Sequence, residues 1–228
     1  MDDAYEALIF SRTLDEFEAW MDEVETQLQS EDHGKDLSSV AHLLKRHTNL
    51  ENDVMSHNEV CESIKETAAN FQRANHFMSE EIKERAAAAI TRYHGLQEPI
   101  QIRRDNLEDA KLLHQFARDV EDELHWLSEK EVLASSKDLG SSLTTVQRLQ
   151  KKHHALEAEL ISREPVVSSL ASRATAMVRS GHFASEKIDS LSRELQEKLL
   201  HLRDLASIRK LRLLDAVESQ MVSEIAYL

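Results

Sequence analysis

The sequence predicts an all-α protein of two tandem three-helix bundles, and three observations support that prediction. The 228 residues include only four Gly and two Pro, too few for the many turns of a β protein. The composition is rich in residues that lose least on entering a helix, among them Leu, Glu, Ala and Lys. Apolar residues recur at alternating steps of three and four, and the whole pattern occurs twice along the chain.

The repeat is visible in matched residues. Trp20 aligns with Trp126, and the same offset holds without a gap along the rest of the unit. Further matched pairs are Leu43 with Leu149, His47 with His153, Leu50 with Leu156, and Phe77 with Phe183. Chance does not preserve register over that distance. We therefore expect one repeat over residues 1–113 and a second over 114–228, with a tail or the start of a further repeat from about 220.

The helices of the first repeat follow from its apolar seam and its breaks. A first helix carries apolar residues up to Leu28, and Ser30–Lys35 supplies Gly and capping residues for a turn. A second helix carries the clearest seam, from Val40 to Phe71, and Asn75 marks the next turn. The alternating three-four spacing is that of a left-handed coiled coil.

A long helical run connects the two repeats. From Met78 to Ser135 only Gly95 and Pro99 interrupt the pattern, and neither lies in a cluster of turn residues. The stretch from Ile102 to Val120 is expected to be one continuous helix that closes the first bundle and opens the second. The residues expected to form this linker helix are Leu107, Ala110, Leu113, Phe116 and Val120.

The second repeat follows the same plan. Ser135–Ser142 provides its first turn, and Gly181 marks its second. Its middle helix contains Pro165, which has no matched proline in the first repeat. Pro99 and Pro165 each remove a backbone hydrogen bond, so each is expected to kink its helix.

Charge and cysteine usage exclude several classes of protein. The formal net charge is −14, from 28 Lys and Arg against 42 Asp and Glu, which disfavours binding to nucleic acid. No basic amphipathic face or long apolar run predicts membrane insertion. The acidic start Met1-Asp2-Asp3 does not resemble a signal peptide, and Met1–Ala4 is expected to begin inside a helix, as in an excised fragment. The lone Cys61 fits a reducing compartment.

Catalytic, cofactor and metal sites are not predicted. Twelve His are present, but none is spaced from another by the three or four residues of a helical metal site. No nucleophile motif or phosphate-binding loop occurs, so we expect no enzyme and no cofactor. The residues expected in the structural core are Trp20, Leu43, His47, Leu50, Phe77, Trp126, Leu149, His153, Leu156 and Phe183. The alternative for the two seam histidines is a pH-sensitive core.

Three blocks of sequence resemble spectrin repeats over nearly the whole chain. They are the Trp-containing FEAWMDEVETQL and DELHWLSEKEVL, the stretches GKDLSSVAHLLKRHTNLE and LGSSLTTVQRLQKKHHALE, and the late NHFMSEEI and GHFASEKI. The details are most similar to the central region of a spectrin α chain. The sequence from Val222 onward departs from the expected start of a further repeat.

The resemblance implies a structural, non-enzymatic segment of the submembrane actin cytoskeleton. Such a segment would act as a flexible, extensible rod-like spacer in the cytoplasm beneath the plasma membrane. Expected partners are a laterally paired spectrin β-like chain and the actin network, with the fragment itself monomeric. Actin binding and actin capping belong to the longer protein, and no residue here is assigned to them. The alternative is a docking module in which one face of a repeat binds a partner chain or an adaptor.

Overall fold

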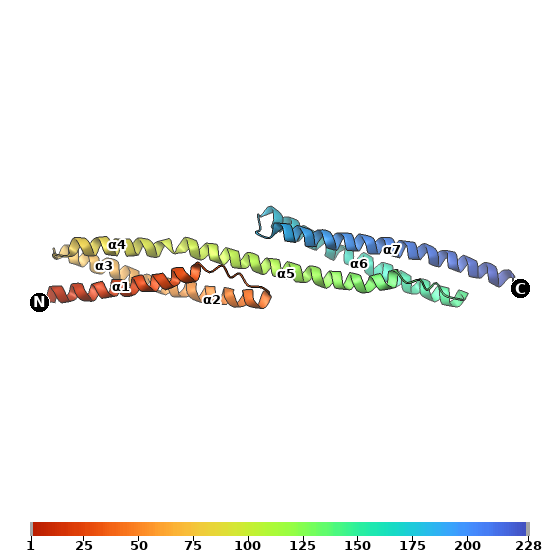
Figure 1. Ribbon diagram of the computed structural model, residues 1–228, viewed down its shortest axis with the longest axis horizontal. Coiled ribbons are helices and arrows are strands. Elements are labelled where there is room, and N and C mark those ends of the chain that lie inside the picture. The colour runs from red at the N-terminus through yellow and green to blue at the C-terminus, as the bar shows by residue number, and fades with distance from the viewer. Residues whose placement is uncertain (1, 227–228) are drawn as a thin grey trace. The chain divides into compact units, whose positions relative to one another are not determined.

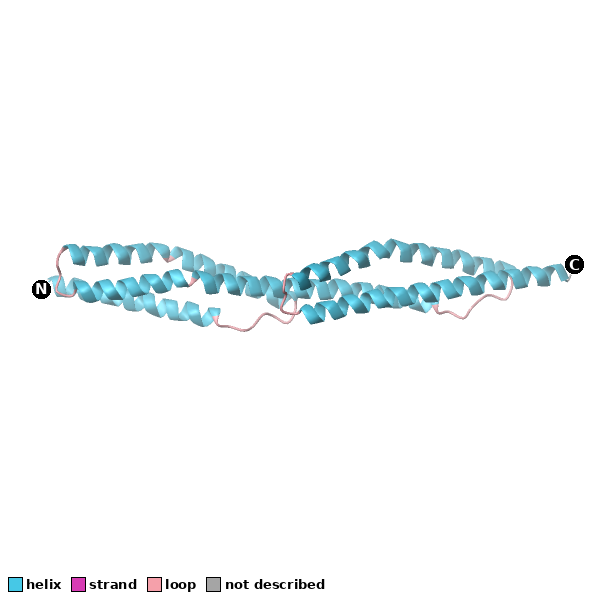
Figure 2. Cartoon of the chain, turned by 90° about the horizontal axis from the view of Figure 1, so that it is seen from above, coloured by secondary structure: helices cyan, strands magenta, loops and turns pink. Residues whose placement is uncertain are grey.

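The computed structural model describes residues 2–226, and every regular element in that range is a helix (Figures 1 and 2). The chain divides into two compact units, Met1–Lys111 and Leu112–Leu228. The helices of each unit pack around a core of their own. The predicted all-α class with tandem helical repeats is confirmed.

Unit 1 is built from five helical stretches. They are α1 (Asp2–Leu28), α2 (Leu37–Ser56), α3 (Asn58–Arg73), α4 (Ser79–Gly95) and the first part of α5 (Gln97–Ala134). Unit 2 contains the rest of α5, followed by α6 (Leu143–Arg179) and α7 (Ser185–Ala226). The expected C-terminal tail from about 220 is helical through Ala226, and its last two residues lie outside the described range, as does Met1.

The first turn of each unit is fixed by a glycine and a capping box. In unit 1, Gly34 adopts φ +81°, and a Cβ there would lie 2.7 Å from the Val40 side chain. The Asp36 side chain then accepts a hydrogen bond from the Ser39 backbone N–H at 2.7 Å. Ser142 and Thr145 form the matched box in unit 2. These contacts satisfy N–H groups that a helix start leaves free.

The second turn of each unit is a Schellman motif. After α3, Asn75 adopts φ 51°, and the His76 N–H donates to the carbonyl of Phe71 at 3.1 Å. After α6, Gly181 adopts φ 78°, and the His182 N–H donates to the carbonyl of Met177 at 3.2 Å. Gly and Asn tolerate this left-handed backbone best, which is why these two residues end the helices.

Unit 1 departs from the expected continuous helices at two places. The seam helix from Val40 to Phe71 is divided into α2 and α3 at His57, and the run from Met78 is divided into α4 and α5 at Leu96. The second division places Pro99 in the first turn of α5, where a missing N–H costs no helical hydrogen bond. Pro165, in contrast, lies inside the uninterrupted α6.

Candidate functional site

The feature with most bearing on function is α5, the one helix of the described chain that belongs to both units. It runs from Gln97 to Ala134, 38 residues, and the boundary between Lys111 and Leu112 falls inside it. All five residues expected in the linker are buried: Leu107, Ala110, Leu113, Phe116 and Val120. Phe116 and Val120 are fully inaccessible to solvent and belong to the core of unit 2.

The unit 2 part of α5 is also held by charge. Arg173 of α6 donates from Nη1 to Asp119 Oδ2 at 2.6 Å, and its guanidinium lies over the ring of Phe116 at 5.9 Å. Gln115 reaches the same carboxylate from one turn earlier, at 2.8 Å. Local polar contacts and core burial therefore both stabilise the helical state of this segment.

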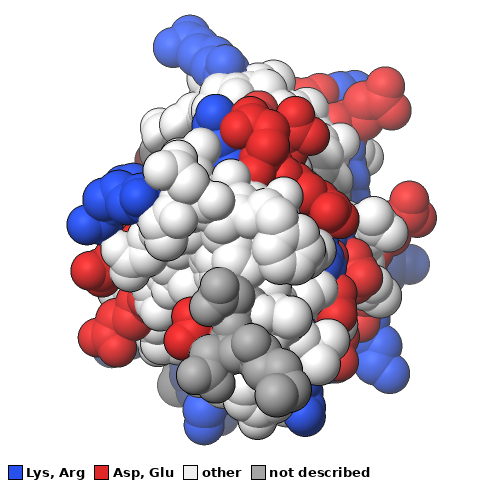
Figure 3. Space-filling model, turned by 90° about the vertical axis from the view of Figure 1, so that its left-hand side faces the viewer, with Lys and Arg blue, Asp and Glu red and all other residues white. Residues whose placement is uncertain are grey.

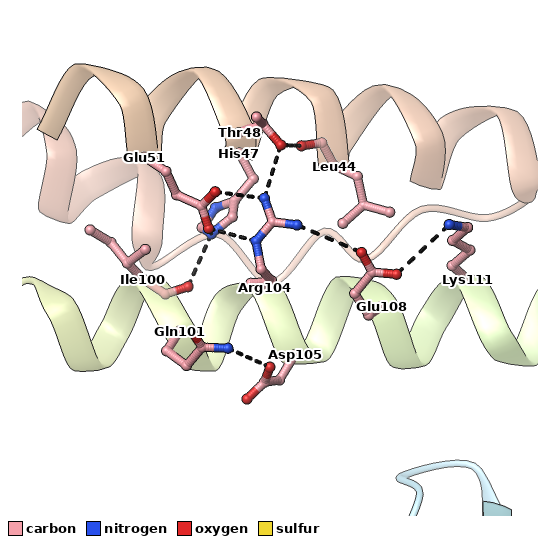
Figure 4. A network of polar contacts seen from close by, with 10 residues as sticks. All are labelled: Leu44, His47, Thr48, Glu51, Ile100, Gln101, Arg104, Asp105, Glu108 and Lys111. Atoms are coloured by element: carbon pink, nitrogen blue, oxygen red, sulfur yellow. Dashed lines mark hydrogen bonds and ion pairs between the residues drawn. The ribbon is translucent and has the colours of Figure 1, made fainter. Parts of the chain in front are cut away.

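The unit 1 part of α5 is anchored to α2 by a polar network around a buried histidine (Figure 4). His47 Nε2 lies 3.0 Å from the carbonyl oxygen of Ile100 and 3.4 Å from Glu51 Oε1. Arg104 donates hydrogen bonds from Nε and Nη2 to the two carboxylate oxygens of Glu51, at 2.6 Å each. It also donates to Thr48 Oγ1 at 2.9 Å. Such a two-pronged pair is stronger and more directional than a single ion pair.

The network shifts the acid–base equilibria of its members. Burial lowers the pKa of the His47 imidazole below its usual value, although Glu51 and the Ile100 carbonyl oppose the shift. The hydrogen bond from Arg104 lowers the pKa of Glu51. In unit 2, burial likewise lowers the pKa of His153, which interacts with Glu157 and the Ala206 carbonyl. Burial therefore favours the neutral form of both histidines.

Two buried arginines occupy matched positions and fasten the first turn of each unit. Arg103 donates from Nη2 to the carbonyl oxygen of Asp32, and Arg209 donates from Nη2 to that of Asp138 at 3.0 Å. Each is only 7% exposed. Loop carbonyl groups are therefore the hydrogen-bond partners of both arginines.

The two tryptophans lie beside the cores and are partly buried, in different surroundings. Trp20 stacks on His57 with ring centroids 3.6 Å apart, and its Nε1 donates to Asp53 Oδ2 at 2.8 Å. Trp126 instead lies under the guanidinium of Arg163, at 4.7 Å from the ring centroid. Arg163 occupies the position matched to His57. The tryptophan is therefore the same in both repeats, while the residue packed against its ring differs.

The other residues expected in the core divide into three groups. His47, Leu50, His153 and Leu156 are buried, while Leu43 and Leu149 are half-buried. Phe77 and Phe183 are 78% and 62% exposed, so their assignment to the core was wrong. The chain reverses at the Schellman turn, and the preceding His points inward instead. His182 is 4% exposed and accepts a hydrogen bond on Nδ1 from the Ala184 N–H at 3.0 Å.

A charged ladder between α1 and α4 was not foreseen. Arg85 binds Asp15 at 2.5 Å and Glu18 at 2.8 Å, both through Nη2. Seven residues later Arg92 repeats the arrangement with Asp22 and Glu25. Hydrogen bonds to these carboxylates raise the pKa of both arginines. The seven-residue spacing on both helices was the available signal, because a heptad keeps one face turned to its partner.

A cavity with a mixed polar and apolar lining opens at the end of unit 1 where α1 begins. Its volume is about 600 Å³, and Phe10, Ile64 and Phe71 contribute to its lining. Uncharged side chains occupy the centre of this end, and charged ones lie toward its margin (Figure 3). The lining also includes polar side chains, among them Glu6, Ser63 and His76.

The described residues offer neither a metal centre nor a membrane span. Within residues 2–226, His, Cys, Asp and Glu side chains do not gather in groups of three or more that could hold a metal ion. Across the same range, no helix combines the length and apolar character needed to cross a bilayer. Cys61 is buried, and burial raises the pKa of its thiol, which disfavours the reactive thiolate.

Comparison with known proteins agrees with this architecture. The profile of the family described as Spectrin repeat matches residues 5–109 and again residues 111–215. The chain belongs to the spectrin-repeat family. The two matched spectrin repeats fall on the two helical bundles. Membership in this family supports a structural cytoskeletal role, and spectrin-family proteins are structural and non-enzymatic.

Individual spectrins match most of the chain. It is 36% identical over 203 residues to spectrin alpha chain, erythrocytic 1, of Mus musculus, a match covering 88% of this chain and 8% of that protein. It is 34% identical over 217 residues to spectrin beta chain, non-erythrocytic 5, of Homo sapiens, covering 95% of this chain and 6% of that protein. The chain thus spans less than a tenth of the length of these relatives. The α- and β-chain relatives match with nearly equal identity.

Proposed function

We propose that this chain is an extensible spacer segment within a longer, spectrin-like cytoskeletal protein beneath the plasma membrane. The observation that supports this most directly is the uninterrupted helix α5 across the boundary of two units with separate cores. A helix shared by neighbouring repeats transmits stiffness, and its loss under load would release length. The spacer itself performs no catalysis and needs no cofactor.

The partners of the longer protein are proposed by analogy with its relatives. Spectrin α and β chains both appear among them, which is consistent with lateral pairing to a β-like chain. A connection to the actin network would be made by parts of the longer protein outside this segment. We expect the segment alone to be monomeric, with a division into repeats near residues 113 and 114.

Force–extension measurement on single molecules tests the spacer role. The chain would be held at its two ends between handles and stretched at constant speed. Because α5 is shared, we expect some molecules to lose both units in one step and others to lose them in two. If the measured force shows no discrete unfolding steps as the chain is stretched, the result would contradict an elastic spacer made of cooperative units.

A matched pair of variants identifies the element responsible. Gln115 is exposed on α5, so Gln115→Pro removes a backbone donor without truncating a core side chain. Gln115→Ala removes the same side chain and keeps the donor. We expect the proline variant to lose the single-step events and the alanine variant to retain them.

A further inference from the structure

The outward face of α7 carries apolar side chains that the bundle does not use. Leu200, Ile208, Leu211 and Leu214 are 58%, 47%, 60% and 45% exposed. Their successive spacings of eight, three and three residues place them on one side of the helix. The core-facing residues of the same segment, such as Leu202 and Leu213, are almost fully buried. The exposed set, which we name the α7 stripe, therefore lies away from the core of unit 2.

The internal repeat shows that the fold does not require this stripe. At the positions matched to Leu200, Leu211 and Leu214, unit 1 has His94, Asp105 and Glu108. The same bundle thus forms with polar residues at three of the four places. Exposed leucines that contribute little to their own fold are unfavourable in water unless a partner covers them.

The charges along the α7 stripe have one sign. Asp204, Asp215 and Glu218 lie on the same side of the helix, between and beside the leucines, and all three are exposed. Within residues 2–226 none of these three carboxylates forms an ion pair. They therefore remain available to a cationic partner.

Most basic residues of the same segment are paired with acidic residues of unit 2. Lys210 reaches Glu157 of α6 at 3.0 Å, and Arg203 reaches Glu164 of α6 at 3.2 Å. Lys198 binds Glu131 of α5. Arg212 follows Ile208 by four residues and is exposed, so it lies at the margin of the stripe, where the three carboxylates outnumber it. Three of these four basic residues are thus paired within the unit, and the stripe is apolar with an excess of negative charge.

We propose that the α7 stripe is a docking surface for a cationic amphipathic helix of another protein. The apolar side of such a helix would cover Leu200, Ile208, Leu211 and Leu214. Lys or Arg residues flanking that side would meet the three carboxylates, which would fix orientation and exclude acidic competitors. This function goes beyond the spacer role and does not depend on it.

A second copy of the chain is a poor occupant on the same evidence. Pairing of two α7 stripes would bring Asp204, Asp215 and Glu218 of each copy toward the same carboxylates of the other. The net charge of −14 on each chain adds long-range repulsion. Charge complementarity therefore favours a cationic partner over self-association.

The test uses the intact chain and a fluorescent synthetic peptide of Leu and Lys patterned as an amphipathic helix. The key variant, Leu211→Asp with Leu214→Glu, installs the residues that unit 1 carries at the matched positions. Circular dichroism and thermal unfolding should be unchanged, because both leucines are exposed and the other bundle tolerates these residues. At physiological salt, we expect fluorescence anisotropy to show binding weakened by about tenfold or more.

The sign of the charge change makes this test decisive. The variant adds two negative charges, so plain attraction of a cationic peptide would become stronger. Unchanged or tighter binding to the variant overturns the proposal, as does absence of binding to the intact chain. If a matched Leu–Glu peptide binds with equal affinity, the proposal that the partner is cationic is overturned. Self-association that the variant abolishes, seen by sedimentation, would make a second copy the occupant instead.

Discussion

At the scale of single residues, the buried histidines couple the folded state to pH. Burial lowers the pKa of His47 and His153 below the usual 6.5, so the unfolded chain binds these protons more tightly than the folded chain does. Stability from this source is therefore complete above the unfolded-state pKa of about 6.5, declines as the pH falls below it, and is lost once the pH has fallen through the lowered folded-state pKa. Each unit of pKa difference corresponds to about 1.4 kcal/mol.

We predict that urea unfolding will show a decline in the free energy of unfolding between pH 7.5 and 5.5. Protonation of His47 and His153 causes this decline. Carboxylates such as Glu51, whose pKa is lowered from 4.5, titrate below this window and contribute little inside it. The double variant His47→Gln with His153→Gln should flatten the decline. His42→Gln, at an exposed position of α2, is the control and should preserve it. An unchanged slope in the double variant would show that the buried imidazoles are not responsible.

Alanine substitutions at two glycines should have different effects on the free energy of unfolding. Gly34→Ala should destabilise unit 1 by about 1–3 kcal/mol, because φ +81° is strained for alanine and the new Cβ would strike Val40. Gly95→Ala should be neutral or stabilising by up to ~1 kcal/mol, because Gly95 lies at the end of α4 with nothing within 4 Å of a Cβ. Chemical denaturation of both variants measures the difference, and equal effects would contradict it.

Sequence reasoning at this scale succeeded where a residue had a matched copy on an apolar seam. It placed His47 and His153 on the seam, where both are buried. It failed for Phe77 and Phe183, since a matched aromatic pair does not reveal which way a chain points after a turn. It also missed the carbonyl partners of Arg103, because a backbone acceptor in a loop leaves no mark in the sequence.

At the scale of helices, one contact between matched helices is an ion pair in unit 1 and apolar in unit 2. In unit 1, Arg85 of α4 binds Glu18 of α1. At the matched positions of unit 2, Leu191 and Leu124 are apolar and pack against the core. Ion pairs that are about one-third exposed weaken as salt screens them, whereas apolar contacts do not.

We predict that salt will loosen α1 and α4 selectively. Hydrogen exchange followed by mass spectrometry, at low salt and at about 1 M NaCl where the screening length is ~3 Å, resolves the two units separately. Exchange should accelerate in peptides from α1 and α4 and change little in those from the start of α7. Arg85→Leu with Glu18→Leu, which copies unit 2, should reduce the salt effect. An equal response of both units would contradict this account.

The order of the helices could be predicted from the seam, but the interruption at His57 could not, because that residue carries no strong turn signal. The break at Leu96 lies between Gly95 and Pro99, the two residues that interrupt the pattern in the sequence. The first interruption lies beside the stacked Trp20, and the Tyr93 hydroxyl donates to the Val54 carbonyl at 2.7 Å nearby. Tertiary contacts of this kind override local helix preference. The docking surface on α7 was also missed, because exposure depends on which side of the helix meets the core.

At the scale of the whole molecule, the central claim is that α5 couples the two repeats. It is a single helix of 38 residues with buried side chains on either side of the boundary between Lys111 and Leu112. In a repeat protein, stability is the sum of each repeat and its coupling to its neighbour. A shared helix supplies that coupling, because unfolding of one unit removes the helical hydrogen bonds that cross the boundary into the other unit.

Differential scanning calorimetry of Gln115→Pro against Gln115→Ala tests this claim most directly. Proline inside a helix costs about 3 kcal/mol or more and interrupts its hydrogen bonds. We predict one cooperative transition for the native chain and for Gln115→Ala, and two separated transitions for Gln115→Pro. A single unchanged transition in the proline variant would contradict coupling through α5.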